Sequence, residues 1–245
     1  MERRPQLSPL LEFDDAVPAF IEPGVYVQAR EVPLACVVTF FGDSVRRLVE
    51  MAGPPSSPRI LGRTAPIRCW RCSTRATGCR GFIVCGGAGA LLPEVTLGHV
   101  VVVESALRDE GTSYHYLPAS RWVDADRAAA SILKQTLDEH GVPFIAGRTL
   151  TTDAPYRETP GKIAARRQEG RVTVEMEAAA LAAVASFRGV PLAHVLYGGD
   201  DLSGQSWDHR SWQTQADVRK SYHVRQALAV IAKQEGGSWL SRTLR

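Results

Sequence analysis

The side chains best suited to chemistry are acids that close two short apolar stretches. Glu175, Met176 and Glu177 follow a β-branched run, and Asp200 and Asp201 follow a second apolar run that ends in two glycines. A carboxylate near a core costs free energy unless something hydrogen-bonds it. Acids placed where two successive elements begin or end therefore indicate a polar ligand at that point.

Ribose is a ligand that suits these acids. Glu177, near an expected helix start, can accept two hydrogen bonds from a vicinal diol, while Met176 lays an apolar thioether on the sugar face. Asp200 can donate a proton to a leaving group. The alternative is that Glu175 and Glu177 only favour a helix N-terminus through its dipole. The residues themselves leave both interpretations open.

The elements that position these acids follow from the sequence pattern. Residues 172–174 are β-branched and predict a strand, and the alanine-rich stretch after Glu177 has helical spacing. Gly189 is expected to end that helix, because glycine readily adopts the left-handed conformation found there. Pro191 then opens the second apolar run. A strand, a helix and a strand therefore carry the acids.

The same strand and helix patterns recur along most of the chain. Further strands are expected at 34–41, 82–85, 99–104 and 142–150, and helices at 45–51, 125–140 and 213–233. The glycines of residues 86–89 are predicted to form a turn that allows close backbone approach. This alternation favours an α/β fold, a three-layer sandwich with a mixed, largely parallel central sheet. Open sheets of this kind place ligands at strand ends.

Two regions depart from this pattern. Residues 1–24 are punctuated by prolines and are expected to form an arm over the domain. Residues 53–80 are rich in Pro, Arg and Ser, and we expect no strand or helix there. Cys69, Cys72 and Cys79 lie in this stretch but lack a well-spaced fourth ligand, so no metal site is expected.

The composition limits the kinds of protein that this chain can be. The 245 residues fit a single domain, and 44% hydrophobic content can fill one core. A net charge of +3, with scattered basic residues, gives no reason to expect a nucleic-acid partner. We find no signal peptide and no membrane-spanning run. An odd count of five cysteines favours reduced thiols and therefore the cytoplasm.

Two long segments resemble a known family. They read GFIVCGGAGALLPEVTLGHVVVVESALRDEG, from residue 81, and VEMEAAALAAVASFRGVPLAHVLYGGDDLSG, from residue 174. Both are similar to the nucleoside phosphorylase family, which includes uridine phosphorylase, hexameric purine nucleoside phosphorylase and methylthioadenosine nucleosidase. The two segments also occur in the family's order and at about its spacing.

The resemblance implies roles for particular residues. It implies that Glu177 binds the ribose hydroxyls above Met176, with Glu175 beside them, and that Asp200 protonates a purine base. It further implies a phosphate site at Gly42, Arg46 and Gly87, a base site including Gly86, and no metal or organic cofactor. The resemblance implies that inorganic phosphate is the co-substrate. It also implies that the protein forms a homodimer or homohexamer.

Some positions depart from the family. The family's phosphorylases carry an arginine where this chain has Val84, and a hydroxyl residue where it has Gly87. The family's hydrolytic nucleosidases also lack that arginine. Val84 therefore favours water as the nucleophile, whereas Gly42 and Arg46 favour phosphate.

The base-binding segment departs as well. Pro155 stands where the family has a phenylalanine that stacks on the base, so Tyr156 is the expected replacement. Arg157 and Glu158 can reach base edges, and His115 lies in an aromatic loop that can touch substrate, as can Asp201. The expected activity is phosphorolysis of a purine ribonucleoside. The alternatives are a hydrolytic nucleosidase and a degenerate, non-catalytic nucleoside-binding protein.

Overall fold

A computed structural model describes residues 8–16, 35–39, 60–62 and 81–211. Its strands are β1 (Ala35–Thr39), β2 (Ile60–Gly62), β3 (Gly81–Ala90), β4 (Val100–Asp109), β5 (Trp122–Asp124), β6 (Phe144–Thr152), β7 (Arg171–Glu175) and β8 (Leu192–Asp201). Its α-helices are α3 (Arg127–Glu139), α4 (Pro160–Gln168) and α5 (Ala178–Arg188), and its 3-10 turns are η1 (Pro9–Leu11), η3 (Ser113–His115) and η4 (Pro155–Arg157). Within the described ranges, no helix has the length and apolar character needed to cross a membrane.

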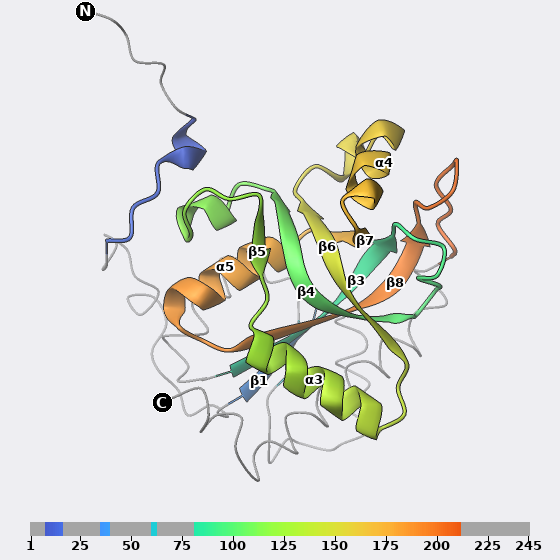
Figure 1. The fold of residues 1–245 in the computed structure, drawn as a ribbon, viewed down its shortest axis with the longest axis horizontal. Coiled ribbons are helices and arrows are strands. Elements are labelled where there is room, and N and C mark those ends of the chain that lie inside the picture. Colours follow the sequence, from blue (N-terminus) through green and yellow to red (C-terminus); the bar gives the residue numbers. More distant parts are fainter. Residues whose placement is uncertain (1–7, 17–34, 40–59, 63–80, 212–245) are drawn as a thin grey trace, which may run out of the picture.

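The strands form one mixed sheet (Figure 1). Its order is β2-β1-β3-β7-β6-β4-β5, and β8 pairs with both β3 and β4. Five of the pairings are parallel: β1 with β2, β1 with β3, β3 with β8, β4 with β6, and β6 with β7. Because β8 joins β3 to β4, the strands β3, β7, β6, β4 and β8 close on themselves. The predicted mixed, largely parallel sheet is confirmed, and this closure is an addition to the prediction.

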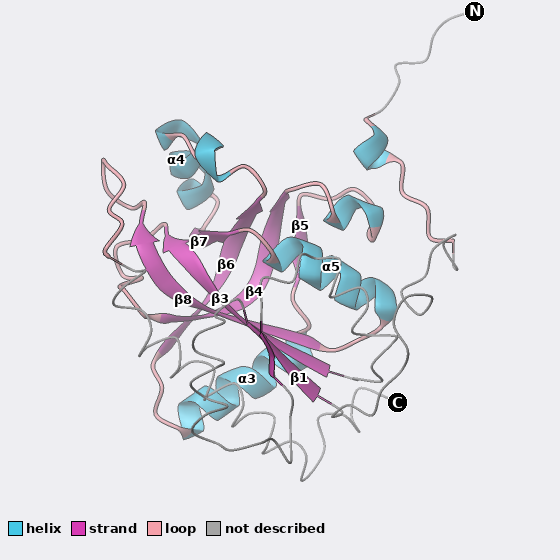
Figure 2. Ribbon diagram, turned by 180° about the vertical axis from the view of Figure 1, so that it is seen from behind, coloured by secondary structure: helices cyan, strands magenta, loops and turns pink. Residues whose placement is uncertain are grey.

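Helices cover both faces of the sheet (Figure 2). Ile83 and Cys85 of β3 pack in the apolar cluster that includes the inner side of α3. Phe82 and Val84, which alternate with them, pack in the cluster that includes Leu181 of α5. Alternate residues of a strand point to opposite faces, so α3 and α5 lie on opposite sides of the sheet. The three-layer α/β sandwich is therefore confirmed.

The boundaries of the helices follow local chemistry. Asp126 caps α3 by accepting hydrogen bonds from the backbone N–H groups of Ala128 and Ala129, at 2.9 and 3.0 Å. Gly189 ends α5 with a φ of 62°, in the left-handed region, as its position predicted. The helix predicted at 125–140 is therefore confirmed, with each end one or two residues inside the expected range.

Two predictions about secondary structure were wrong. The glycines at 86–89 form no turn, because β3 continues through them to Ala90 and pairs with β8 over most of this length. Residues 53–80 were expected to contain no strand, yet β2 (Ile60–Gly62) pairs in parallel with β1. The helices predicted at 45–51 and 213–233 lie outside the described residues.

Candidate active site

The carboxylate of Glu175 holds the first turn of α5. Its Oε2 accepts hydrogen bonds from the backbone N–H groups of Glu177 and Ala178, at 2.7 and 2.6 Å, and its Oε1 accepts one from Thr151 Oγ1 at 2.6 Å. Burial raises the pKa of Glu175 to about 7, although these three hydrogen bonds oppose the increase. Glu175 is therefore committed to positioning the helix start, which places Glu177 and Met176.

Glu177 is the N-cap residue of α5, but its side chain makes no capping hydrogen bond. Burial raises the pKa of its carboxyl group, while the backbone N–H of Met176 lowers it. Met176 is 44% exposed beside it. A half-buried carboxylate next to an exposed thioether has the chemistry that binding of a sugar requires.

Gly89 of β3 brings Asp200 next to the end of β7. A Cβ placed on Gly89 would lie 3.1 Å from Val174 Cγ1 and 3.4 Å from Asp200 Oδ1. Val174 is the residue before Glu175, and Gly89 pairs with it across the sheet. The end of β7, which leads into Glu177, and the end of β8, which carries Asp200, therefore lie on either side of one glycine.

The two adjacent aspartates have different surroundings. Asp200 Oδ2 accepts a hydrogen bond from Trp207 Nε1 at 2.6 Å. Asp201 binds the guanidinium of Arg210 and accepts the backbone N–H of Ser203 at 2.7 Å. Partial burial acts to raise the pKa of Asp201, but Ser203 and Arg210 together lower it below its usual value. Asp201 therefore fixes the loop that follows β8, and Asp200 keeps one oxygen, Oδ1, directed at Gly89.

Glu158 is a second acid in the neighbourhood of Asp200. Burial, together with the negative charge of Asp200, raises the pKa of Glu158 to about 7. Its sequence position, after Tyr156 and Arg157, predicted only a contact with a base edge. The proximity to Asp200 was not predicted, because it depends on how the loop before α4 folds back.

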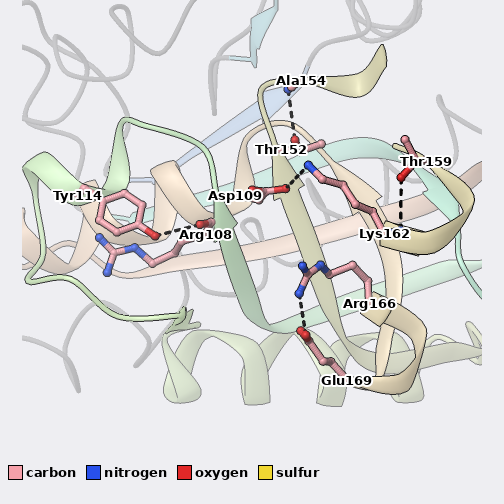
Figure 3. Close-up of polar contacts among 9 residues, drawn as sticks. All are labelled: Arg108, Asp109, Tyr114, Thr152, Ala154, Thr159, Lys162, Arg166 and Glu169. Atoms are coloured by element: carbon pink, nitrogen blue, oxygen red, sulfur yellow. Dashed lines mark hydrogen bonds and ion pairs between the residues drawn. The ribbon is translucent and has the colours of Figure 1, made fainter. Parts of the chain in front are cut away.

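A set of polar contacts holds that loop at the ends of β4 and β6 (Figure 3). Thr152 Oγ1 accepts the backbone N–H of Ala154 at 3.2 Å, and Lys162 Nζ lies 3.9 Å from Asp109 Oδ2. Arg166 donates to Glu169 at 2.6 Å. Tyr156 is 99% exposed, and Arg157 lines a small hollow beneath α4 together with Glu158. Stacking of Tyr156 on a base stays a prediction.

His115 lies on the surface, in a loop that is held by hydrogen bonds among its own residues. Arg108 donates to Ser113 Oγ at 2.8 Å and to Pro118 O at 2.7 Å, and Glu110 accepts the backbone N–H of Ser113 at 3.0 Å. The loop packs against α5. Its role in substrate binding stays a prediction.

The expected phosphate site is only partly described. Gly42 and Arg46 lie outside the described residues. Val84 is fully buried in the apolar cluster against α5. A Cβ on Gly87 would lie 2.7 Å from the Tyr197 hydroxyl oxygen, so Tyr197 occupies the space that a serine or threonine side chain would need. Gly86 is buried in the same strand.

A family comparison covers most of the chain. The profile described as the phosphorylase superfamily matches residues 36–233. The chain belongs to the phosphorylase superfamily. Glu177 and Asp200 both fall in the matched region, as do the undescribed Gly42 and Arg46.

Individual relatives are similar to this superfamily protein over only part of its sequence. A uridine phosphorylase from Thermococcus kodakarensis is 30% identical over 128 residues, which are 47% of this chain and 46% of the relative. A guanosine phosphorylase from Halorubrum lacusprofundi is 28% identical over 153 residues, which are 60% of this chain and 64% of the relative. The chain therefore matches less than two thirds of each of these relatives.

Solved structures share the fold of this superfamily protein. A 5'-methylthioadenosine/S-adenosyl homocysteine nucleosidase from Campylobacter jejuni superposes with a TM-score of 0.66 at 15% identity, covering 82% of this chain and 99% of that one. A futalosine hydrolase from Helicobacter pylori superposes with a TM-score of 0.65 at 14% identity, covering 81% and 98%. At these identities the likeness concerns the fold alone.

Proposed function

We propose that the protein cleaves the N-glycosidic bond of a purine ribonucleoside by phosphorolysis, giving the free base and ribose 1-phosphate. The observation that carries the proposal is the position of Gly89 between the end of β7 and Asp200. It supports a site in which Glu177 and Asp200 act on the same substrate. The uridine and guanosine phosphorylases among the relatives support phosphate as the acceptor.

In this proposal Glu177 holds the 2' and 3' hydroxyls of the ribose. Cleavage of the bond leaves positive charge on the sugar ring, and a carboxylate beside the ring stabilises that charge more than it stabilises the neutral substrate. Glu175 keeps Glu177 in place through the first turn of α5. Met176 supplies the apolar surface beneath the ring.

Asp200 donates a proton to the departing base. Trp207 holds Oδ2, so the proton is carried on Oδ1, the oxygen nearer to Gly89. Glu158 has a pKa of about 7 and therefore holds a proton for part of the time at neutral pH. An acid at position 200, where the resemblance places arginine in pyrimidine-specific relatives, supports a purine base.

Hydrolysis is the second candidate function, and a specific observation favours it. Val84 packs in an apolar cluster, and Tyr197 fills the space beside Gly87, so neither position offers a phosphate ligand. A buried hydrogen bond from arginine to phosphate contributes about 1.5–3 kcal/mol, and its loss would lower phosphate affinity by about one to two powers of ten. Water would then accept the sugar.

One assay separates the two candidates. The purified protein is incubated with inosine, adenosine, uridine and methylthioadenosine, each with and without inorganic phosphate, and the free base is quantified. Strict phosphate dependence with ribose 1-phosphate as product supports phosphorolysis. Equal rates with and without phosphate support hydrolysis. Absence of base release from every nucleoside, by protein that binds them, would overturn the enzymatic proposal.

A further inference from the structure

A second cavity lies at the opposite end of β7 from the candidate active site. It has a volume of about 430 Å³, and it lies between α3 and the part of the sheet formed by β4, β5, β6 and β7. Arg171, which begins β7, lines it, whereas Glu175 ends the same strand four residues later. A strand rises about 3.3 Å per residue, so about 13 Å separates these two residues along the backbone.

One row of side chains runs across the sheet at the base of this cavity. Asp124 of β5 pairs with Ser105 of β4, Ser105 pairs with Arg148 of β6, and Arg148 pairs with Arg171 of β7. Paired residues of adjacent strands lie side by side and point to the same face of a sheet. All four line the cavity. The strand register therefore brings the two arginines together beneath α3.

The backbone is irregular at this row. The pairing register shifts between Val103 and Ser105, where β4 has one residue more than β6, and again opposite Arg148 and Thr149, where β7 has one residue more than β6. A bulge re-aims the side chains around it and is often found beside a functional site. Two such shifts therefore flank Arg148 of β6 at the level of this row, one toward β4 and one toward β7.

Arg171 is a buried side chain in this cavity whose guanidinium group is not fully hydrogen-bonded. It is 3% exposed, its NH1 donates to Ser105 Oγ at a long 3.4 Å, and its Nε has no hydrogen-bond partner among the described residues. Burial lowers its pKa, and the positive charge of Arg148 lowers it further, while the negative charge of Glu169 acts in the opposite direction. A buried guanidinium with an unused N–H and a like charge beside it is stabilised by an anion.

The charges that line the cavity leave a positive excess. Four basic side chains, of Arg127, Lys134, Arg148 and Arg171, face two acids, and one of the acids, Glu104, already pairs with Lys134 at 3.1 Å. Planar guanidinium groups match the oxygens of a phosphate in pairs. The positive excess is therefore of the kind that phosphate groups neutralise.

We propose that this cavity binds a small phosphorylated metabolite, with the phosphate group between Arg148 and Arg171. The volume exceeds that of phosphate and falls in the range of pockets for small molecules. Trp122, which is 51% exposed, lines the cavity and offers an aromatic face for a ring of the ligand. The ligand class is therefore a sugar phosphate or nucleoside monophosphate, bound apart from the candidate active site.

Calorimetric titration of the full chain tests this proposal with three probes: inorganic phosphate, ribose 5-phosphate and adenosine 5'-monophosphate. Arg148→Gln is the main variant, because Arg148 is exposed and its loss leaves the core unchanged. We expect Arg148→Gln to weaken binding of the tightest probe by about tenfold or more. Arg167→Gln is the matched control, since Arg167 donates to Ser203 O and does not line the cavity. Its effect should be several times smaller.

Two further variants locate the bound probe. Glu177→Gln alters the candidate active site and should leave the affinity for the probe unchanged, whereas Trp122→Ala should weaken the nucleoside monophosphate and not inorganic phosphate. The proposal is overturned if Glu177→Gln abolishes binding while Arg148→Gln does not, or if no probe binds with a Kd below about 1 mM. Because heat reports binding directly, a failure of the nucleoside-cleavage assay leaves this result intact.

Discussion

The two ends of β7 carry side chains of opposite charge. These side chains differ in how far the protein satisfies their hydrogen-bonding groups. At the end of β7, the carboxylate of Glu175 receives three hydrogen bonds, from Thr151 and from two backbone N–H groups of α5. At its beginning, the guanidinium of Arg171 has one long contact with Ser105 and an unused Nε–H within the described part of the chain. The hydrogen-bonding atoms of Glu175 are satisfied by the protein itself, and those of Arg171 are not.

This difference teaches which groups are free to act. Because both oxygens of Glu175 accept hydrogen bonds at the start of α5, we propose that the chemistry at that end falls to its neighbour Glu177 and to Asp200. At the other end, the unsatisfied group is the buried arginine, and the proposed ligand would complete the arrangement. Acids at one end suit a cationic transition state, and arginines at the other suit an anionic ligand. The following changes test each half of the comparison.

The largest effect is expected from Asp200→Asn. An amide cannot deliver a proton, and general acid catalysis contributes about 10²–10⁴-fold, so the turnover number should fall by that factor. Steady-state rates of base release measure it. Asp201→Asn makes the same change one residue later, where the carboxylate binds Arg210 and Ser203. Asp201→Asn should mainly lower the free energy of unfolding. A larger loss of turnover in Asp201→Asn than in Asp200→Asn would contradict the assignment.

Local pattern was sufficient to predict the elements that carry these acids. The β-branched run before Glu175, the alanine spacing after Glu177 and the glycine at 189 each specify conformation within a few residues, and the structure agrees. β5 and α4 were not predicted. β5 has only three residues, and α4 has a narrow apolar side with Ile163 as its buried residue. Periodicity is weak in segments this short or this polar.

The pairing of distant residues could not be predicted from sequence. The glycines of β3 have the composition of a turn, but a glycine is also needed where another chain segment comes close. Gly87 and Gly89 serve that second purpose, against Tyr197 and Leu202. In the same way, the row that joins Arg148 to Arg171 depends on strand register, and no residue near either position in the sequence indicates it.

The next largest effect is expected in the pH dependence of stability at Glu175. Its pKa is about 7 in the folded protein against 4.5 in the unfolded chain, so the folded state binds more protons between these values. The free energy of unfolding should therefore fall as pH rises from about 4.5 to about 7. Glu175→Gln cannot ionise and should remove roughly 3 kcal/mol of this fall.

Urea denaturation at pH 4.5, 6 and 8 measures the difference between wild type and Glu175→Gln. The exposed Glu94→Gln is the matched control and should follow the wild type at every pH. If Glu175→Gln loses stability with rising pH as steeply as the wild type does, Glu175 is not the group responsible. The raised pKa assigned to the buried Glu175 carboxyl group would then be wrong.

A smaller effect is expected from Gly87→Ala, which tests whether Tyr197 occupies the space beside β3. The new methyl group would lie 2.7 and 2.9 Å from Tyr197 Oη and Cζ, so the structure must shift. Overpacking of this kind costs about 1–3 kcal/mol of unfolding free energy. Gly161→Ala in α4 is the control, because its Cβ would meet no atom within 4 Å. Equal stability of the two variants would show that the space beside Gly87 is free for a phosphate ligand.

The smallest effect is expected from Trp207→Phe, which keeps an aromatic ring but removes the N–H that binds Asp200 Oδ2. Trp207 is 64% exposed, so solvent can replace part of the lost hydrogen bond. We expect kcat to fall by about three- to tenfold, with KM and the free energy of unfolding nearly unchanged. Trp207→His, which can restore an N–H donor, should recover part of the rate. A fall in kcat shared equally by both variants would mean that ring packing, and not the hydrogen bond, orients the acid at the end of β8.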